Sequence, residues 1–338
     1  MSQIKTIIVF RHGLLGDHVV AVPALELLRK NFSEAKIIYC SEYQVDSGHR
    51  LFSETLHNLD LIDEFTEFSF RVLGPFLTLV VKLMLMSRRS TLIVNLEKVG
   101  WSDRRERFCR WLGFVNVVGP VQRPIEVSLS INQMLSDIAL LASSRFKTIQ
   151  GKSFFRSSHH ELPEKLIAKL PQENFLCVTP WSNMDCKRWP EKNFRSLVES
   201  LLEFDVNIVL LGGRDKEEIK LGEKLAYNHR ITSLVGKTSV WESYLVLQMA
   251  YGFIGNDTGT LHLAALAKCN WVGLYSHREY DAKLWAPISN PGVRGQVLVK
   301  NVICRGCQER TCPFVSSRCI DEIKVGEVVR AAKENFYL

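Results

Sequence analysis

The stretch from Tyr251 to Ser276 holds the clearest candidates for chemistry in the sequence. Its pattern predicts a strand, a turn at residues 255–257, a helix and a second strand. A helix that starts at such a turn presents free backbone N–H groups and the positive end of its dipole, which suits an anion such as phosphate. An ordinary helix cap at Asp257 and a surface histidine at His262 would give the same pattern. The candidate residues are Asp257, Thr258, Gly259, Thr260 and His262.

A second candidate loop follows the strand predicted at Thr6–Phe10 and reads Arg11-His12-Gly13-Leu14-Leu15-Gly16-Asp17. Apolar residues then recur at helical spacing up to Asn31, so the chain runs from strand through loop into helix. The carboxylate of Asp17 could take a proton from a substrate hydroxyl. The spacing alone favours Asp17 as the N-cap of a helix that begins near Val19.

A third loop, from Pro180 to Pro190, follows the strand predicted at Phe175–Thr179. It contains Lys187, a compact positive charge that suits phosphate, and Ser182, whose hydroxyl is a neutral donor. A solvated lysine ahead of a helix is the alternative. Phosphate contact explains Lys187 better.

Arginines gather on the helix predicted at Trp101–Leu112, where Arg104, Arg107 and Arg110 are spaced three apart. Their guanidinium groups could bind the phosphates or carboxylates of a substrate. Acidic residues lie between them, so a solvated helix face explains the pattern equally well.

Four cysteines lie close together near the C-terminus: Cys304, Cys307, Cys312 and Cys319. Four thiolates in such a short span could hold one zinc ion, but the second pair is spaced more widely than in a usual zinc knuckle. A reduced or partly paired loop with a packing role is the favoured interpretation, and no metal is predicted. Residues 5–10 do not resemble a secretory signal, and the remaining cysteines are scattered, which favours a reducing cytoplasm.

Strands alternate with helices along both halves of the chain, which predicts an α/β protein with parallel sheets covered on both faces. The alternation stops at residues 143–163, a polar stretch that suits a connection between domains. We therefore predict two Rossmann-like domains, 1–155 and 156–322, and a closing helix in 323–338 that packs back towards the N-terminal domain. Ligands of such sheets bind beyond the carboxyl ends of the strands, so Asp17 and Asp257 are expected to line one interdomain cleft.

The totals limit the functional class. A length of 338 residues is enough for two domains, and the net charge of +7 suits an anionic substrate or a membrane surface better than nucleic acid. The apolar segment Val72–Met86 is too short for a membrane span and is interrupted by Pro75 and Lys82. A core helix is the default interpretation, and a basic-flanked helix lying on the inner membrane surface is the alternative.

The three loops together resemble glycosyltransferase family 9, which includes the ADP-heptose:lipopolysaccharide heptosyltransferases. The Arg11–Asp17 loop, followed by Pro23-Ala24-Leu25, resembles the N-terminal signature of that family. Residues 257–264 resemble its D-T-G-x-x-H nucleotide loop, and residues 180–190 resemble its lysine-bearing loop. The likeness is spread over nearly the whole chain. It implies a GT-B fold, with two facing Rossmann-like domains.

The resemblance also implies the reaction. We expect an inverting, metal-independent glycosyltransferase that moves heptose from ADP-heptose to a lipopolysaccharide-core or related lipid-linked or phosphorylated glycan. Asp17 would be its general base. No cofactor is expected, and the sequence has no Asp-x-Asp triplet to bridge a metal to the diphosphate. The enzyme would be cytoplasmic, with the inner face of the membrane as a further partner and no role for nucleic acid.

The resemblance assigns the remaining site residues by domain. The N-terminal domain would bind the acceptor, where Arg11, His12, Arg104 and Arg107 are the candidates. The C-terminal domain would bind the donor through Ser182, Lys187, Glu217, Thr238, Asp257, Thr258, Gly259, Thr260 and His262, with Glu217 and Thr238 near the nucleoside.

Other functions stay open. The run Arg11-His12-Gly13 is also similar to the R-H-G motif of histidine phosphatases, in which a phosphohydrolase reaction would pass through His12. That motif normally continues with a small hydroxyl or amide residue, where this chain has Leu14, and it leaves the Asp257 loop unexplained. A non-catalytic nucleotide-sugar binder and a UDP-sugar epimerase would share the architecture.

Overall fold

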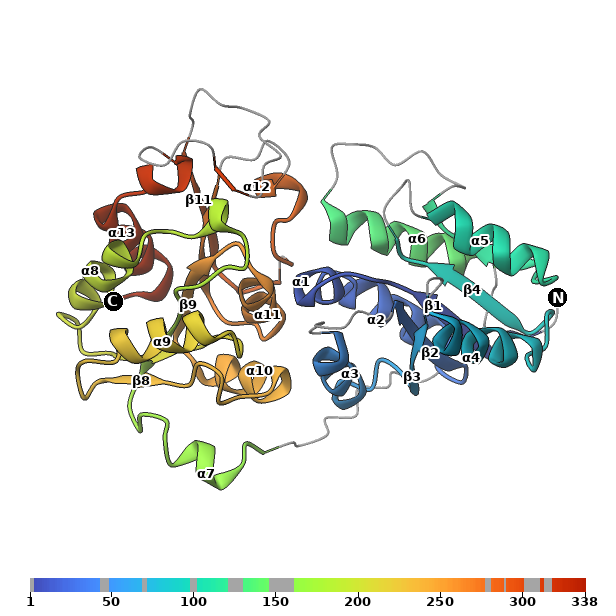
Figure 1. Ribbon diagram of the computed structural model, residues 1–338, viewed down its shortest axis with the longest axis horizontal. Coiled ribbons are helices and arrows are strands. Elements are labelled where there is room, and N and C mark those ends of the chain that lie inside the picture. The colour runs from blue at the N-terminus through green and yellow to red at the C-terminus, as the bar shows by residue number, and fades with distance from the viewer. Residues whose placement is uncertain are drawn as a thin grey trace. The chain divides into compact units, whose positions relative to one another are not determined.

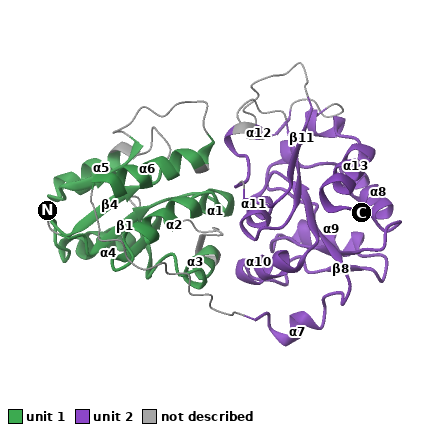
Figure 2. Cartoon of the chain, turned by 180° about the vertical axis from the view of Figure 1, so that it is seen from behind, with its two compact units in different colours: residues 1–160 green, residues 161–338 purple. Residues whose placement is uncertain are grey.

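The computed structural model describes residues 3–42, 49–68, 72–97, 102–120, 130–145, 161–276, 281–288, 290–300, 311–312 and 318–338. The chain folds as two compact units, residues 1–160 and 161–338, which Figure 2 colours separately. The predicted boundary at residues 155 and 156 lies near this division. The prediction of an α/β protein with parallel sheets is confirmed in both units.

Unit 1 contains a five-stranded parallel sheet in the order β3-β2-β1-β4-β5. Its central strands are continuous apolar runs because helices cover both faces of such a sheet. The strands are β1 (Thr6–Phe10), β2 (Lys36–Glu42), β3 (Glu64–Phe68), β4 (Thr91–Asn95) and β5 (Asn116–Val118). The helices are α1 (Leu15–Val19), α2 (Val22–Asn31), α3 (His49–Asn58), α4 (Leu73–Met84), α5 (Ser102–Trp111) and α6 (Ile131–Arg145) (Figure 1).

Two of these helices share one core with the sheet. Leu79 and Leu83 of α4 and Cys109 of α5 pack in a single buried cluster with Ile8 and Phe10 of β1. The segment predicted as a core helix at Val72–Met86 is therefore a helix with one face in the core. In the described part of the chain, every helix is too short or too polar to cross a bilayer.

Unit 2 contains a six-stranded parallel sheet in the order β11-β10-β9-β6-β7-β8. The strands are β6 (Phe175–Thr179), β7 (Asn207–Leu210), β8 (Ile231–Ser233), β9 (Gly252–Asn256), β10 (Trp271–Tyr275) and β11 (Gly295–Val299). The helices are α7 (Glu164–Ile167), α8 (Glu191–Leu201), α9 (Lys216–Leu225), α10 (Val240–Met249), α11 (Gly259–Leu266), α12 (Asp281–Leu284) and α13 (Val325–Phe336), with 3₁₀ turns η2 (Asp185–Lys187) and η3 (Cys319–Glu322).

The C-terminal helix α13 belongs to unit 2. Its apolar face, with Val328, Ala331 and Phe336, is buried in the core that also contains residues of α8. Gly252 of β9 makes room for this helix, because a Cβ atom there would lie 2.6 Å from the ring of Phe336. The structure thus places residues 323–338 within unit 2, and packing towards the N-terminal domain stays a prediction.

Each sheet reverses its strand order at one place. In unit 1 the chain builds β1, β2 and β3 outwards and then returns to place β4 on the other side of β1. In unit 2 it builds β6, β7 and β8 and returns to place β9 beside β6. Ligands of open α/β sheets bind outside the carboxyl ends of the strands at such reversals. The loops after β1 and β4, and those after β6 and β9, are therefore the places to examine.

Candidate functional site

The loop after β9 leads directly into α11. β9 is buried along its length and ends at Asn256, and Thr258 occupies the N-cap position with an extended backbone. Asp257 is therefore not the N-cap, and the Thr258 side chain makes no capping hydrogen bond. The first backbone N–H groups of α11 have no partners within a helix, so they remain available at the strand edge.

Asp257 is paired with two side chains at this edge. Lys187 Nζ forms an ion pair with Asp257 Oδ2, and His262 Nε2 lies 3.8 Å from Asp257 Oδ1. Burial alone would raise the pKa of Asp257, but His262 and Lys187 outweigh it and hold that pKa below its ordinary value. Asp257 therefore stays ionised and fixes the positions of Lys187 and His262.

The loops after β6 and β9 are joined by hydrogen bonds. Trp189 N–H donates to Asn256 Oδ1 at 3.1 Å, and Trp189 Nε1–H donates to the carbonyl of Ile323 at 2.9 Å. Arg188 donates to the carbonyl of Ser182 at 2.5 Å and stacks on Trp181, with its guanidinium 3.7 Å from the ring centroid. The structure thus brings Ser182, Lys187 and the Asp257–His262 segment to one edge of the sheet.

Several buried polar atoms at this edge have no hydrogen-bond partner among the described residues. All of them belong to groups that can donate a hydrogen bond. Buried donors are normally paired in folded proteins, so a cluster of them points to a ligand with many acceptor oxygens. The atoms are Thr179 Oγ1, Trp181 Nε1, Asn256 Nδ2, Thr258 Oγ1, His262 Nδ1 and Ser276 Oγ.

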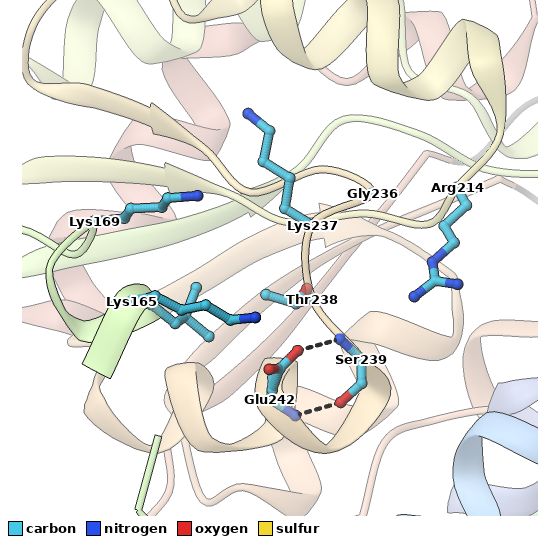
Figure 3. Close-up of a pocket in the computed structure, with 9 residues that line it drawn as sticks. Lys165, Lys169, Arg214, Gly236, Lys237, Thr238, Ser239 and Glu242 are labelled. Carbon is cyan, nitrogen blue, oxygen red and sulfur yellow. Dashed lines mark hydrogen bonds between the residues drawn. The ribbon is translucent and has the colours of Figure 1, made fainter. Parts of the chain in front are cut away.

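A pocket of about 350 Å³ lies beside the loops that follow β7 and β8 (Figure 3). Thr238 lies in it, and its hydroxyl shares a hydrogen bond of 2.8 Å with Ser243. Glu242 also lines the pocket, but its carboxylate accepts the Ser239 N–H at 2.7 Å and so caps α10. The volume suits part of a small ligand. The remaining lining residues are Lys165, Leu166, Lys169, Arg214, Gly236, Lys237 and Ser239.

Glu217 is exposed in the first turn of α9 and does not line this pocket, whereas its neighbour Glu218 is buried. Burial raises the pKa of Glu218 from its ordinary value of 4.5 to about 7, against the opposing effect of the hydrogen bond from the Gly213 backbone. A Cβ on Gly212 would lie 2.3 Å from Glu218 Oε1, so a larger residue there would displace this carboxylate. The glycine pair after β7 was the signal for this buried carboxylate, and the sequence analysis missed it.

In unit 1, Asp17 is held in place from two sides. It is the third residue of α1, which begins before the predicted position near Val19, and Asp17 Oδ2 accepts the Leu14 N–H at 3.0 Å. Buried Arg11 donates to the Asp17 carbonyl at 2.9 Å, to the Leu96 carbonyl at 2.7 Å and weakly to Asp17 Oδ1 at 3.5 Å. The Asp17 side chain is 26% exposed, so its carboxylate is fixed but still accessible.

His12 is paired with a buried carboxylate across the reversal of the unit 1 sheet. His12 Nδ1 lies 2.5 Å from Glu97 Oε2, and Arg105 of α5 lies 3.4 Å from Glu97 Oε1. Nearby, His18 Nδ1 pairs with the Tyr39 hydroxyl at 2.8 Å. Glu97 and Arg105 were not among the predicted site residues, because no local pattern links them to His12.

Arg104 and Arg107 are exposed on α5, and the arginine that turns inwards is Arg105. Cys304 and Cys307 lie outside the described residues, while Cys312 and Cys319 are half-buried. The interpretation of these cysteines stays a prediction.

Comparison with known proteins gives a consistent result. A family model described as glycosyltransferase family 9 (heptosyltransferase) matches residues 122–316, more than half of the chain. Lipooligosaccharide heptosyltransferase 2 of Campylobacter jejuni is 21% identical, with 94% of each chain covered.

Solved structures show a likeness of fold. The ADP-heptose lipopolysaccharide heptosyltransferase II of Escherichia coli has a TM-score of 0.67 at 13% identity over 98% of both chains. E. coli heptosyltransferase WaaC with ADP has a TM-score of 0.66 at 14% identity, covering 98% of this chain and 99% of the other. The predicted GT-B type of fold is confirmed by this likeness.

Proposed function

The chain belongs to glycosyltransferase family 9, the heptosyltransferases, and from this premise we propose that it transfers heptose from ADP-heptose to a lipopolysaccharide-core or related glycan with inversion. Its relatives support this choice of substrates: one is a lipooligosaccharide heptosyltransferase, and another was solved with ADP. A phosphohydrolase reaction at His12 and a non-catalytic role both fit this family less well.

The donor diphosphate would bind at the carboxyl ends of β6 and β9. Transfer leaves negative charge on the departing diphosphate. Hydrogen-bond donors already fixed around the diphosphate therefore lower the barrier to transfer. Lys187 and His262 are held there by Asp257, and the buried unpaired donors of Asn256 and Thr258 lie in the same two loops. Gly259 and Thr260 add the N-terminal backbone of α11. No metal or other cofactor is assigned to this step.

The nucleoside would extend from the diphosphate towards the pocket that Thr238 lines. That pocket lies beside the loops that follow β7 and β8. These two strands come after β6 in the sheet, on the side away from β9. Glu218 is buried against Gly212, just after β7, so we assign the polar contact with the nucleoside to Glu218 and not to the exposed Glu217.

Asp17 would act as the general base. Its carboxylate takes the proton of the acceptor hydroxyl as the oxygen attacks the anomeric carbon, and the bond to the diphosphate breaks with its electrons going to the leaving group. The buried guanidinium of Arg11 donates hydrogen bonds to the carbonyls of Asp17 and Leu96, and these contacts orient Asp17. His12 is more accessible and is the better candidate to contact the acceptor. This reaction requires the Asp17 and Asp257 loops to face one cleft, which is part of the proposal.

The acceptor would be a lipid-linked or phosphorylated glycan, reached by the protein from the cytoplasm at the inner face of the membrane. Arg104 and Arg107 are exposed and carry charges that suit its phosphate groups.

The single observation that carries the proposal is the cluster of buried, unpaired donors around the Lys187–Asp257 pair. We expect ADP and ADP-heptose to raise the melting temperature more than GDP or UDP sugars, because a ligand that binds only the folded state stabilises it. Transfer to a heptose-deficient glycan would then be followed by mass spectrometry. Equal stabilisation by all nucleotides would remove the ADP-heptose assignment, and absence of transfer from any donor would contradict the proposed activity.

A further inference from the structure

Helix α4 of unit 1 is apolar on both of its faces. Leu79 and Leu83 point into the core of the unit. On the opposite face Leu73, Leu77 and Val81 recur every four residues and are exposed. A helix that is apolar all round normally has both faces covered.

The exposed face extends past α4. Leu73 is 71% exposed, Leu85 just after the helix is 83% exposed, and Trp111 at the end of α5 is 79% exposed. The two helices are in contact, because the rings of Phe76 and Phe108 lie 5.8 Å apart and Phe108 stacks on Trp111 at 6.2 Å. We call this the α4–α5 surface. It consists of Leu73, Leu77, Val81, Met84, Leu85, Trp111 and Val115.

The exposed charges described beside this surface are mainly basic, because Glu106 of α5 is buried and Glu64 of β3 is paired with Lys82 of α4. The segment from residue 72 to residue 90 has no acidic residue, and it ends in Arg88 and Arg89. Arg88 donates to the carbonyls of Met84 and Met86 and so is fixed at the end of α4. The exposed face of α5 adds three more arginines beside Trp111: Arg104, Arg107 and Arg110.

We propose that the α4–α5 surface rests on an anionic lipid bilayer, with the leucines and Trp111 at the level of the head groups and the arginines against lipid phosphates. Apolar helix faces with basic flanks and an exposed tryptophan bind membranes in this way. A second copy of the chain fits less well, since a symmetric interface would bring the arginines of both copies together. The purpose of this contact, reaching a lipid-linked acceptor, rests on the proposed function, but the contact itself does not.

Co-sedimentation with vesicles tests the proposal. The full chain is expected to bind vesicles of phosphatidylcholine mixed with phosphatidylglycerol, and to bind phosphatidylcholine alone much more weakly. Added salt should weaken the binding, because the arginines act through screened charges. Leu77→Ser with Val81→Ser should weaken binding at least about tenfold, since each buried side chain contributes about that factor or more.

Matched variants separate this surface from general surface effects. Leu140→Ser with Met249→Ser also removes two exposed apolar side chains, from α6 and α10, and should leave vesicle binding unchanged. Arg89→Gln with Arg110→Gln should reduce binding to the anionic vesicles at low salt, and the apolar surface stays intact. Unchanged melting temperatures would show that all three variants are folded.

Two results would overturn the proposal. One is that the wild-type protein does not bind anionic vesicles, or that Leu77→Ser with Val81→Ser binds them as strongly as the wild type does. The other is a dimer in analytical ultracentrifugation that Leu77→Ser with Val81→Ser dissociates, without vesicle binding, which would make the surface an interface between copies. Transfer to a water-soluble acceptor glycan should survive the α4 variant. If no transfer occurs from any donor while vesicle binding still depends on α4, the proposed function fails and this inference stands.

Discussion

Lys187 and Asp257 are 70 residues apart in the sequence and form a buried ion pair where the strand order of unit 2 reverses. Lys187 comes from the loop after β6 and Asp257 from the loop after β9, so the pair ties together the two central loops of the sheet. A buried charge without its partner is costly, whereas an intact pair adds little net stability. The pair therefore serves to position Lys187 more than to stabilise the fold.

A double-mutant cycle tests this interpretation. Lys187→Met is expected to lower the free energy of unfolding by about 3 kcal/mol or more, because Asp257 is left buried with only His262 beside it. Lys187→Met combined with Asp257→Asn should recover a large part of that loss. Urea unfolding of the two single variants and the double variant measures the coupling. Additive losses would show that the pair does not interact in solution.

The raised pKa of Glu218 predicts a pH-dependent stability. Its folded pKa of about 7 lies above the ordinary value of 4.5, so the folded protein retains a proton that the unfolded chain releases. The contribution of Glu218 to the free energy of unfolding is fully present below about pH 4.5 and is lost as the pH rises through about 7. The total change is about 3 kcal/mol, from a shift of roughly 2.5 units.

Glu218→Gln removes the ionisation but keeps a similar volume. Relative to wild type, the variant should become more stable as the pH is raised from 4 to 8, by an amount on the order of 3 kcal/mol. Urea unfolding at several pH values measures the difference. Glu217→Gln is the matched control, because Glu217 is exposed and should show no such trend. Parallel curves for wild type and Glu218→Gln would mean that Glu218 ionises normally in the folded protein.

Three of the buried strands could be predicted from the sequence to the residue. β1 at Thr6–Phe10, β6 at Phe175–Thr179 and β10 at Trp271–Tyr275 have the bounds that their apolar runs indicated. This works because a parallel strand covered on both faces needs apolar residues at every position. The loops at Lys187 and Asp257 followed from the same pattern, since each begins where an apolar run ends.

The partners of the site residues could not be predicted in this way. His12 and Glu97 are 85 residues apart, and only the adjacency of β1 and β4 brings them together. Glu217 was assigned from the resemblance to the family, and only the fold shows that the neighbouring carboxylate, Glu218, is the one that points inwards. Asp17 was interpreted as a helix cap from spacing, and its carboxylate does accept a terminal N–H, but from within α1.

Two glycines give opposite expectations for stability. Gly252→Ala places a methyl group 2.6 Å from the Phe336 ring between β9 and α13, so the free energy of unfolding should fall by about 1–3 kcal/mol. Gly326→Ala lies in α13 with nothing within 4 Å, so it should raise stability by about 0.5–1 kcal/mol. Thermal unfolding of both variants measures this. Similar effects of both changes would argue against the packing of α13 on β9.

The role of Asp17 can be separated from its structural contacts by Asp17→Asn. The amide oxygen can still accept the Leu14 N–H, so the start of α1 and the melting temperature should change little. The amide cannot take a proton, so kcat should fall by about 100- to 10,000-fold if Asp17 is the general base. Stabilisation by ADP should be unchanged, because the proposed donor site lies in unit 2. His12→Gln is the comparison: if His12 only contacts the acceptor, it should raise the acceptor KM more than it lowers kcat. A full loss of kcat in His12→Gln with near-normal activity in Asp17→Asn would transfer the role of base from Asp17 to the His12–Glu97 pair.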